Sequence, residues 1–255
     1  MSILNRITAS TKERVERDKK SGLPQNAKPR PPFLFEQSLR KPGISFICEV
    51  KKASPSKGVI ADDFPYINIA REYEDGGADA VSVLTEPDHF QGSDRYLAEI
   101  RETVNIPLLR KDFIIDPFQI EQSVRLGADA ILLICAILTP VQLAEYIKAA
   151  DRLGLSCLVE AHDENELKTA LIAGARTVGV NNRNLNTFEV DTGNSLRLRK
   201  IAPKDVIFVS ESGIRTAEDI EILYRNDIDA VLIGEALMRS PDKKAALSAL
   251  RGKLP

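Results

Sequence analysis

A five-residue motif recurs four times along this chain and sets the unit from which its fold is built. The motif reads GADAV at residues 77–81, GADAI at 127–131, GARTV at 174–178 and, in a degenerate form, DIDAV at 227–231. Its copies begin 50, 47 and 53 residues apart, and each joins the end of a predicted helix to the start of an apolar run. In the first three copies a glycine is placed to end the helix. A spacing of about 50 residues indicates four repeated units, each with more than one element.

Eight short apolar runs give the number of strands. They are almost continuously apolar, as expected of strands that are buried on both faces of a parallel sheet. The predicted strands cover residues 44–50, 80–84, 106–109, 130–135, 155–159, 177–180, 206–209 and 230–233. Amphipathic helices are predicted near residues 66–75, 93–103, 117–126, 140–153, 163–173, 193–200, 216–225 and 243–252. Each repeat then holds two strand–helix units, so the chain predicts a single α/β domain, a (β/α)8 TIM barrel over residues 44–255.

Residues 1–43 form a helical extension ahead of the barrel. Ile3, Leu4, Ile7 and Val15 have helical spacing, and residues 11–20 are strongly charged, so we expect an amphipathic helix over residues 3–19. Residues 22–32 contain four prolines and indicate a linker. Residues 33–40 then predict a second short helix. The apolar face of the first helix must pack on another part of the protein.

Composition limits the class of protein. With 255 residues, 43% of them hydrophobic, the chain is long enough for one domain with a large core. A net charge of −2 gives no sign of a nucleic-acid partner. The sequence has no run of 18 apolar residues, and its amino terminus lacks the apolar core of a signal peptide. We therefore expect a cytoplasmic protein without nucleic-acid or membrane partners, and either a monomer or a weak homodimer.

The cysteines and histidines do not suggest a metal site. Cys48, Cys135 and Cys157 each lie in an apolar run, where a free cysteine is usually a small buried residue in a reducing compartment. A catalytic thiol is the less favoured alternative. The chain has no CxxC pair, and neither His89 nor His162 has ligand-like spacing, so we expect no metal. We expect His162 to be a solvated loop residue.

Charged residues follow most of the apolar runs, at the strand ends where the catalytic groups of such barrels gather. Buried carboxylates in this position must pair with lysines or bind a ligand, because burying an unpaired charge is costly. The alternative is that these residues are solvated strand ends. That alternative is weakest for Glu49, Glu160 and Glu211, which interrupt or directly follow apolar runs. The residues predicted to converge on the barrel mouth are Glu49, Lys51, Lys111, Glu160, Asn181 and Glu211.

A phosphate site is predicted where the last two strands end. In barrels of this kind the loops after strands seven and eight often bind phosphate through backbone N–H groups. Here these loops hold Ser212-Gly213 and Gly234-Glu235, and Glu235 would contribute only through its backbone N–H. The loop that contains Ser54 would complete the site with hydroxyl and cationic groups. The alternative is that the glycines serve only tight turns.

The motifs at these strand ends resemble those of the indole-3-glycerol phosphate synthase family. They read EVKKASPS at residues 49–56, LRKDF at 109–113, LVE at 158–160, GVNNRNL at 179–185, SESGI at 210–214 and IGE at 233–235. The resemblance covers nearly the whole chain, including the helical extension. It implies a carboxy-lyase of tryptophan biosynthesis. The reaction closes the ring of 1-(2-carboxyphenylamino)-1-deoxyribulose 5-phosphate, with loss of CO2 and water, and gives indole-3-glycerol phosphate.

The resemblance also implies roles for the acids and bases. Lys111 is the leading candidate for the acid at the substrate ketone, and Glu160 for the base of the dehydration. Lys51 would protonate the departing hydroxyl group, although the division of work between the two lysines stays open. Glu49 and Glu211 would orient the lysines and bind hydroxyl groups. Decarboxylation restores the benzene ring without an external electron sink, so no cofactor is implied.

The remaining implied contacts concern binding. Asn181 would hold a neutral polar group of the substrate in place, and Arg183 would add positive charge for the anionic substrate. Phe113, together with Phe90, would pack on its aromatic ring. We also expect the loop of residues 56–63 to close over the bound substrate.

Three other functions stay open on the sequence alone. A lysine beside carboxylates in a barrel is able to form a Schiff base with a carbonyl substrate. A phosphoribosylanthranilate isomerase-like barrel would share the phosphate site, but the resemblance to that enzyme does not extend to the extension or to the Glu-x-Lys motif of strand one. A non-catalytic binder of phosphorylated ligands would have lost a site residue, and none is missing.

Overall fold

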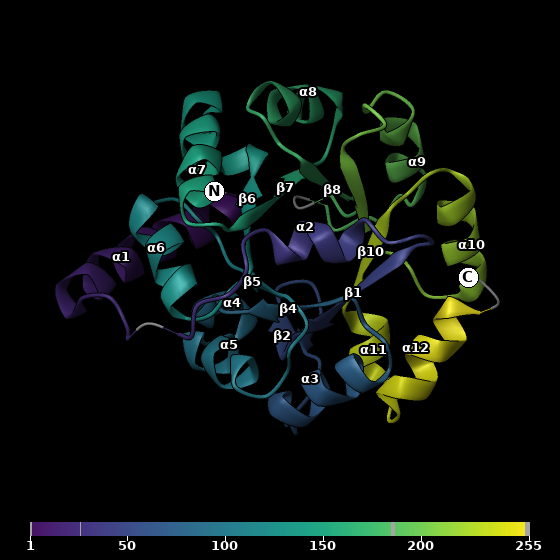
Figure 1. Ribbon diagram of the computed structural model, residues 1–255, viewed down its shortest axis with the longest axis horizontal. Helices are drawn as coiled ribbons and strands as arrows, with labels where there is room; N and C mark the ends of the chain where they lie inside the picture. The colour runs from purple at the N-terminus through teal and green to yellow at the C-terminus, as the bar shows by residue number, and fades with distance from the viewer. Residues whose placement is uncertain (1, 26, 185–186, 253–255) are drawn as a thin grey trace.

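The centre of the computed structural model, which describes residues 2–25, 27–184 and 187–252, is a closed barrel of eight parallel strands (Figure 1). The strands follow chain order around the ring, and the last pairs with the first. This arrangement confirms the predicted (β/α)8 barrel. The barrel strands are β1 Ser45–Val50, β4 Ala80–Leu84, β5 Leu108–Lys111, β6 Ala130–Ile134, β7 Ser156–Ala161, β8 Thr177–Asn181, β9 Ile207–Glu211 and β10 Ala230–Ile233.

Helices surround the barrel in alternation with the strands (Figure 1). All eight predicted helices of the barrel are present, and their ends differ from the prediction by no more than two residues. They are α3 Tyr66–Asp75, α5 Asp94–Arg101, α6 Pro117–Arg125, α7 Pro140–Arg152, α8 Glu164–Ile172, α9 Gly193–Arg199, α10 Ala217–Arg225 and α12 Lys243–Arg251. The sequence did not predict four short features, the β2 Ala53–Ser54 and β3 Gly58–Val59 hairpin, α4 Pro87–Phe90, η1 Cys135–Ile137 and α11 Glu235–Arg239.

The repeated motif links neighbouring strands by hydrogen bonds. In three of its four copies the third residue is an aspartate, whose carboxylate accepts a hydrogen bond from a backbone N–H near the start of the preceding strand. The donors and acceptors are Phe46 to Asp79 (2.9 Å), Leu108 to Asp129 (2.9 Å) and Phe208 to Asp229 (2.7 Å). In the remaining copy Arg176 replaces the aspartate and pairs with Glu36 and Asp151. The motif therefore has a structural role at the amino ends of the strands.

The first residue of the motif sits in left-handed backbone conformation after its helix. Gly127 follows α6 with a φ of +87°, a conformation that glycine adopts without steric cost. The degenerate fourth copy has Asp227 at this place, with a φ of +56°. Aspartate is one of the few other residues that tolerate this region, so the departure from glycine leaves the turn in place.

The buried apolar residues form one cluster inside the barrel and another between the strands and the outer helices. The inner cluster includes Ile47, Leu109, Leu158 and Val209, which alternate along their strands with residues of the outer cluster. The three cysteines are free, and Cys48 and Cys157 are buried as expected, whereas Cys135 is only partly buried, contrary to the expectation. Burial also raises the pKa of the partly buried Cys135 to about 12, which argues against a nucleophilic thiolate.

Several strands extend further at their carboxyl ends than the apolar runs predict. The runs at 106–109, 155–159 and 206–209 become strands that end at Lys111, Ala161 and Glu211. The backbone pairing continues through the polar residues, with Leu84 opposite Lys111 and Ile134 opposite Glu160. The apolar residues end before the carboxyl ends of these strands, whereas the backbone hydrogen bonds between the strands continue through the polar residues. The side chains of Lys111, Glu160 and Glu211 are therefore held by regular sheet and not by loops.

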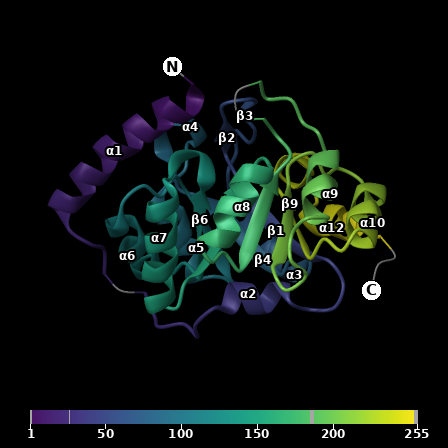
Figure 2. The same cartoon turned by 90° about the horizontal axis from the view of Figure 1, so that it is seen from above.

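The extension covers both ends of the barrel (Figure 2). Helix α1, Ile3–Ser21, crosses the end where the strands finish, and α2, Leu34–Leu39, packs under the opposite end. Helix α1 is held by an ion pair between the largely buried Arg14 Nη2 and the Asp112 Oδ1, 2.6 Å apart. Asp112 also contacts Arg110 and Thr85. The predicted amphipathic helix is thus confirmed, and its docking surface is the mouth of the barrel.

We predict that Arg14→Ala lowers the free energy of unfolding by about 2 kcal/mol, because it leaves the buried Asp112 carboxylate with one cation fewer. Urea denaturation would measure the loss. Arg17→Ala is the matched control, since Arg17 is exposed on the same helix and makes the same change in helix propensity. Equal losses in the two variants would contradict a role for the ion pair in docking α1.

Candidate active site

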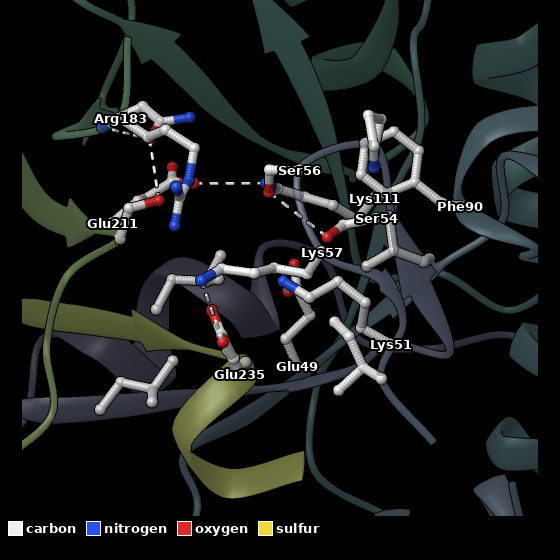
Figure 3. Close-up of a pocket in the computed structure, with 18 of the residues that line it drawn as sticks. Glu49, Lys51, Ser54, Ser56, Lys57, Phe90, Lys111, Arg183, Glu211 and Glu235 are labelled. Carbon is white, nitrogen blue, oxygen red and sulfur yellow. Dashed lines mark hydrogen bonds and ion pairs between the residues drawn. The ribbon is translucent and has the colours of Figure 1, made fainter. Parts of the chain in front are cut away.

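A cavity of about 530 Å³ lies at the carboxyl ends of the strands, and every residue that we predicted for the site lines it. Figure 3 shows the charged side chains around this cavity, with Glu49 and Lys51 from the end of β1, Lys111 from β5 and Glu211 from β9. The barrel thus brings together residues that are far apart in the sequence. The predicted motif at residues 179–185 ends in Leu185, which lies outside the described residues.

Lys111 forms the centre of the charged cluster. Its Nζ lies 3.3 Å from Glu211 Oε2 and 3.7 Å from Glu160 Oε2, and both carboxylates are at least 97% buried. Burial by itself lowers the pKa of Lys111, but the carboxylates of Glu211, Glu160 and Glu49 outweigh it and raise this pKa above the ordinary value. Lys111 is therefore an ammonium ion at neutral pH.

The surroundings of Glu211 disfavour its charged form. Its burial raises its pKa to about 7, and although Lys111 opposes this shift, the neighbouring Glu160 adds to it. Its second oxygen, Oε1, has no hydrogen-bond partner among the described residues. Two carboxylates thus share one lysine, and one buried carboxylate oxygen has no hydrogen-bond donor among the described residues.

Glu49, on β1, and Lys51, just after the end of this strand, form a second pair. Lys51 Nζ donates a hydrogen bond to Glu49 Oε2. Burial acts to raise the pKa of Glu49, yet the charges of Lys51 and Lys111 hold it below the ordinary value. A Cβ at position 234 would clash with Glu49 Oε2 and Lys51 Nζ, so any other residue there would displace these two groups. Gly234 therefore makes room for this pair.

Asn181 and its neighbour Asn182 organise the ends of β8 and β9. Asn181 Oδ1 accepts hydrogen bonds from Ser212 Oγ and from the Arg183 backbone N–H, both at 3.0 Å. The buried Asn182 donates to the backbone carbonyl of Ser212 at 3.1 Å. Ser212 has a positive φ of 70°, and Gly213 follows with another, so Asn182 supports an unusual turn. Sequence analysis missed Asn182, although its place between two predicted site residues was a signal.

The predicted phosphate side of the cavity holds Ser54, Ser212, Gly213 and the start of α11. The Glu235 side chain, which we did not expect to bind phosphate, pairs instead with Lys57 at 3.6 Å and with Arg239 at 3.2 Å (Figure 3). Its backbone N–H lies in the first turn of the helix, at the N-terminal end that attracts anions.

An apolar wall closes the other side of the cavity. The rings of Phe90 and Phe113 have their centroids 6.0 Å apart, and Leu132 lies on the same wall. Helix α1 contributes Ile3, Leu4 and Ile7. The sequence predicted an apolar face on α1 but gave no sign that this face lines the site.

His162 is not a solvated loop residue, and this expectation was wrong. Its side chain is only 20% exposed, and its Nε2 lies 3.5 Å from Glu160 Oε1. Its Nδ1 lies 3.0 Å from Glu166 Oε2. The apolar run before Glu160 hid the fact that β7 continues to Ala161, which places the following residue beside the cluster.

No group of three or more His, Cys, Asp or Glu side chains in the described ranges is arranged to hold a metal ion. No helix in this part of the chain is long and apolar enough to cross a membrane.

Comparison with known proteins identifies the family. The model of the indole-3-glycerol phosphate synthase family matches residues 4–250. The indole-3-glycerol phosphate synthase of Ruminiclostridium cellulolyticum is 60% identical, covering 98% of this chain and 99% of the relative. That of Endomicrobium trichonymphae is 57% identical, with the same coverage.

Comparison of structures shows the fold alone. The 3-hexulose-6-phosphate synthase from Salmonella typhimurium matches with a TM-score of 0.67 at 14% identity, covering 81% of this chain and 96% of that one. The sequence relationship is far more specific than this similarity of fold. The chain belongs to the indole-3-glycerol phosphate synthase family and is a carbon–carbon lyase of tryptophan biosynthesis.

Proposed function

We propose that Lys111 is the acid that starts the reaction of this site on 1-(2-carboxyphenylamino)-1-deoxyribulose 5-phosphate. The observation that carries this assignment is the position of Lys111 Nζ in the barrel mouth, between the buried carboxylates of Glu160 and Glu211. An ammonium ion there protonates the oxygen of the substrate ketone while the aromatic carbon attacks the carbonyl carbon. The new carbon–carbon bond closes the ring.

Glu160 and Lys51 complete the chemistry in this proposal. The bond to CO2 breaks, and its electron pair restores the benzene ring. Glu160 then removes a proton from a carbon atom of the new ring. The electron pair of that C–H bond forms the double bond as the hydroxyl group, protonated by Lys51, leaves as water. Glu49, hydrogen-bonded to Lys51, and Glu211, paired with Lys111, hold the two ammonium groups in place.

The two ends of the substrate match the two sides of the cavity. The phosphate would bind at Ser212, Gly213 and Gly234, where backbone N–H groups and the N-terminal end of α11 meet. Ser54 and Arg183 would add polar and cationic contacts, and Asn181 would hold a hydroxyl group. The aromatic ring would lie against Phe113 and Phe90.

We also propose that the chain acts in the cytoplasm, as a monomer or a weak homodimer. Its three cysteines are free thiols, as expected in a reducing compartment.

We predict that Glu160→Gln and Lys111→Ala each lower kcat more than about a hundredfold, because each removes a proton-transfer group. The fluorescence of the indole product would measure turnover, with purified protein, a metal chelator and no added cofactor. Glu164→Gln makes the same chemical change on the exposed side of α8 and should keep full activity. Near-normal turnover in Glu160→Gln or Lys111→Ala would remove that residue from the mechanism.

We predict that residues 56–63, which include the tip of the β2–β3 hairpin, close over bound substrate. The ion pair between Lys57 and Glu235 already links this loop to α11 beside the phosphate side. Amide hydrogen exchange of this loop should slow when a substrate analogue is added, and inorganic phosphate alone should have a smaller effect. Unchanged exchange with the analogue would contradict closure.

A further inference from the structure

The ring of His162 is fixed in one orientation beside the proposed base. Its backbone N–H donates to Glu166 Oε2 at 2.8 Å, and its Nδ1 contacts the same oxygen at 3.0 Å. The side chain of Asn194, from α9, donates to the His162 carbonyl at 2.9 Å. Because β7, α8 and α9 all hold this residue, its Nε2 points at Glu160 Oε1, 3.5 Å away.

The hydrogen-bond chemistry of this contact leaves Nε2 available to Glu160. The Glu166 carboxylate only accepts hydrogen bonds, so Nδ1 carries a proton. Nε2 is buried and has no hydrogen-bond partner among the described residues. A proton on Nε2 would make the ring an imidazolium, with one N–H toward each carboxylate.

A cation at this place would balance the excess of negative charge in the cluster. Lys51 is paired with Glu49, which leaves Lys111 to balance both Glu160 and Glu211. Lys111 contacts Oε2 of Glu160, whereas His162 faces the other oxygen, Oε1. Two buried carboxylates with one shared cation are costly, and a second positive charge on the far side of Glu160 relieves that cost.

We infer that His162, held by Glu166, is a positioning residue that as an imidazolium fixes the Glu160 carboxylate and keeps it ionised. This inference rests on the proposed role of Glu160 as the base. Oε1 is then occupied by His162, which leaves Oε2, the oxygen on the Lys111 side, to take the proton from the substrate. Glu166 acts indirectly, by orienting the ring of His162.

The surroundings of the ring are consistent with a positive charge. The charged groups that face it are Glu160 on β7, Glu166 on α8 and, further away, Glu211 on β9. Burial acts to lower the pKa of His162, but the hydrogen bond to Glu166 and the charge of Glu160 outweigh it and raise this pKa above the ordinary value. The thiol of Cys135, on η1, donates to the backbone carbonyl of Glu166 and carries no charge toward the ring.

The first test measures the pairing directly, without catalysis. The chain has only two histidines, so a nuclear magnetic resonance titration in the His89→Gln background reports His162 alone. We expect a pKa above 6.5 that falls on the order of one pH unit in Glu160→Gln and in Glu166→Gln. A His162 pKa at or below 6.5, or one that Glu160→Gln leaves unchanged, would overturn the inference.

The second test asks whether the pairing matters in turnover. In His162→Gln we expect kcat to fall about tenfold or more with little change in KM, and the acid limb of the pH profile of kcat to move to higher pH. That limb reports the ionisation of the Glu160 and Glu211 cluster, which would have lost a cation. His89→Gln is the matched control, because His89 does not line the cavity, and its profile should be that of the unchanged protein.

The outcomes separate this inference from the proposed function. An equal loss of activity at every pH in His162→Gln, with thermal unfolding unchanged, would reduce His162 to a packing role and overturn the inference. If Glu160→Gln stays active, the proposed base is wrong, yet the titration still decides whether His162 and Glu160 are coupled. If Glu160→Gln is inactive and the acid limb of the kcat profile shifts in His162→Gln, the results support both the proposed base and this inference.

Discussion

The site depends on one interaction, the sharing of the Lys111 ammonium group between buried carboxylates. Glu160 and Glu211 come from strands that are distant in the chain, and neither is exposed enough for water to stabilise its charge. In such surroundings each charge decides whether its neighbours are ionised. Lys111 stays protonated because of the carboxylates. Glu211 has a pKa raised to about 7, first because it is buried and then because Glu160 adds a second negative charge beside the same lysine.

The same strand that delivers Lys111 also anchors the extension. Side chains alternate along β5, so Lys111 faces the cavity while Arg110 faces the outer helices. Arg110 is almost fully buried and contacts Asp94, Ser123 and Thr85. Asp112, the next residue after Lys111, binds Arg14 of α1. The helix that supplies the apolar wall is thus tied to the residue beside the central lysine.

Sequence reasoning found the barrel because the repeat and the apolar runs report burial, which the fold requires at every strand. It found the charged residues of the site because they break those runs at one end. It missed contacts that depend on how elements meet in space, such as Ile3 and Leu4 of α1 on the cavity wall. It placed His162 wrongly, since nothing in the local pattern shows that β7 continues past the apolar run.

The fold by itself says little about the reaction, as the match to a barrel of 14% identity shows. What is specific here is the charge arrangement, and the proposed reaction changes it at a defined point. On the proposed mechanism, the substrate carboxylate adds a negative charge inside the cavity, and the proton from Lys111 adds a positive one when the ring closes. When that carboxylate leaves as CO2, its electron pair neutralises the positive charge that ring closure placed on the aromatic ring. In this mechanism Lys111 has by then given up its proton, so Lys51 is the ammonium group that remains for the dehydration step.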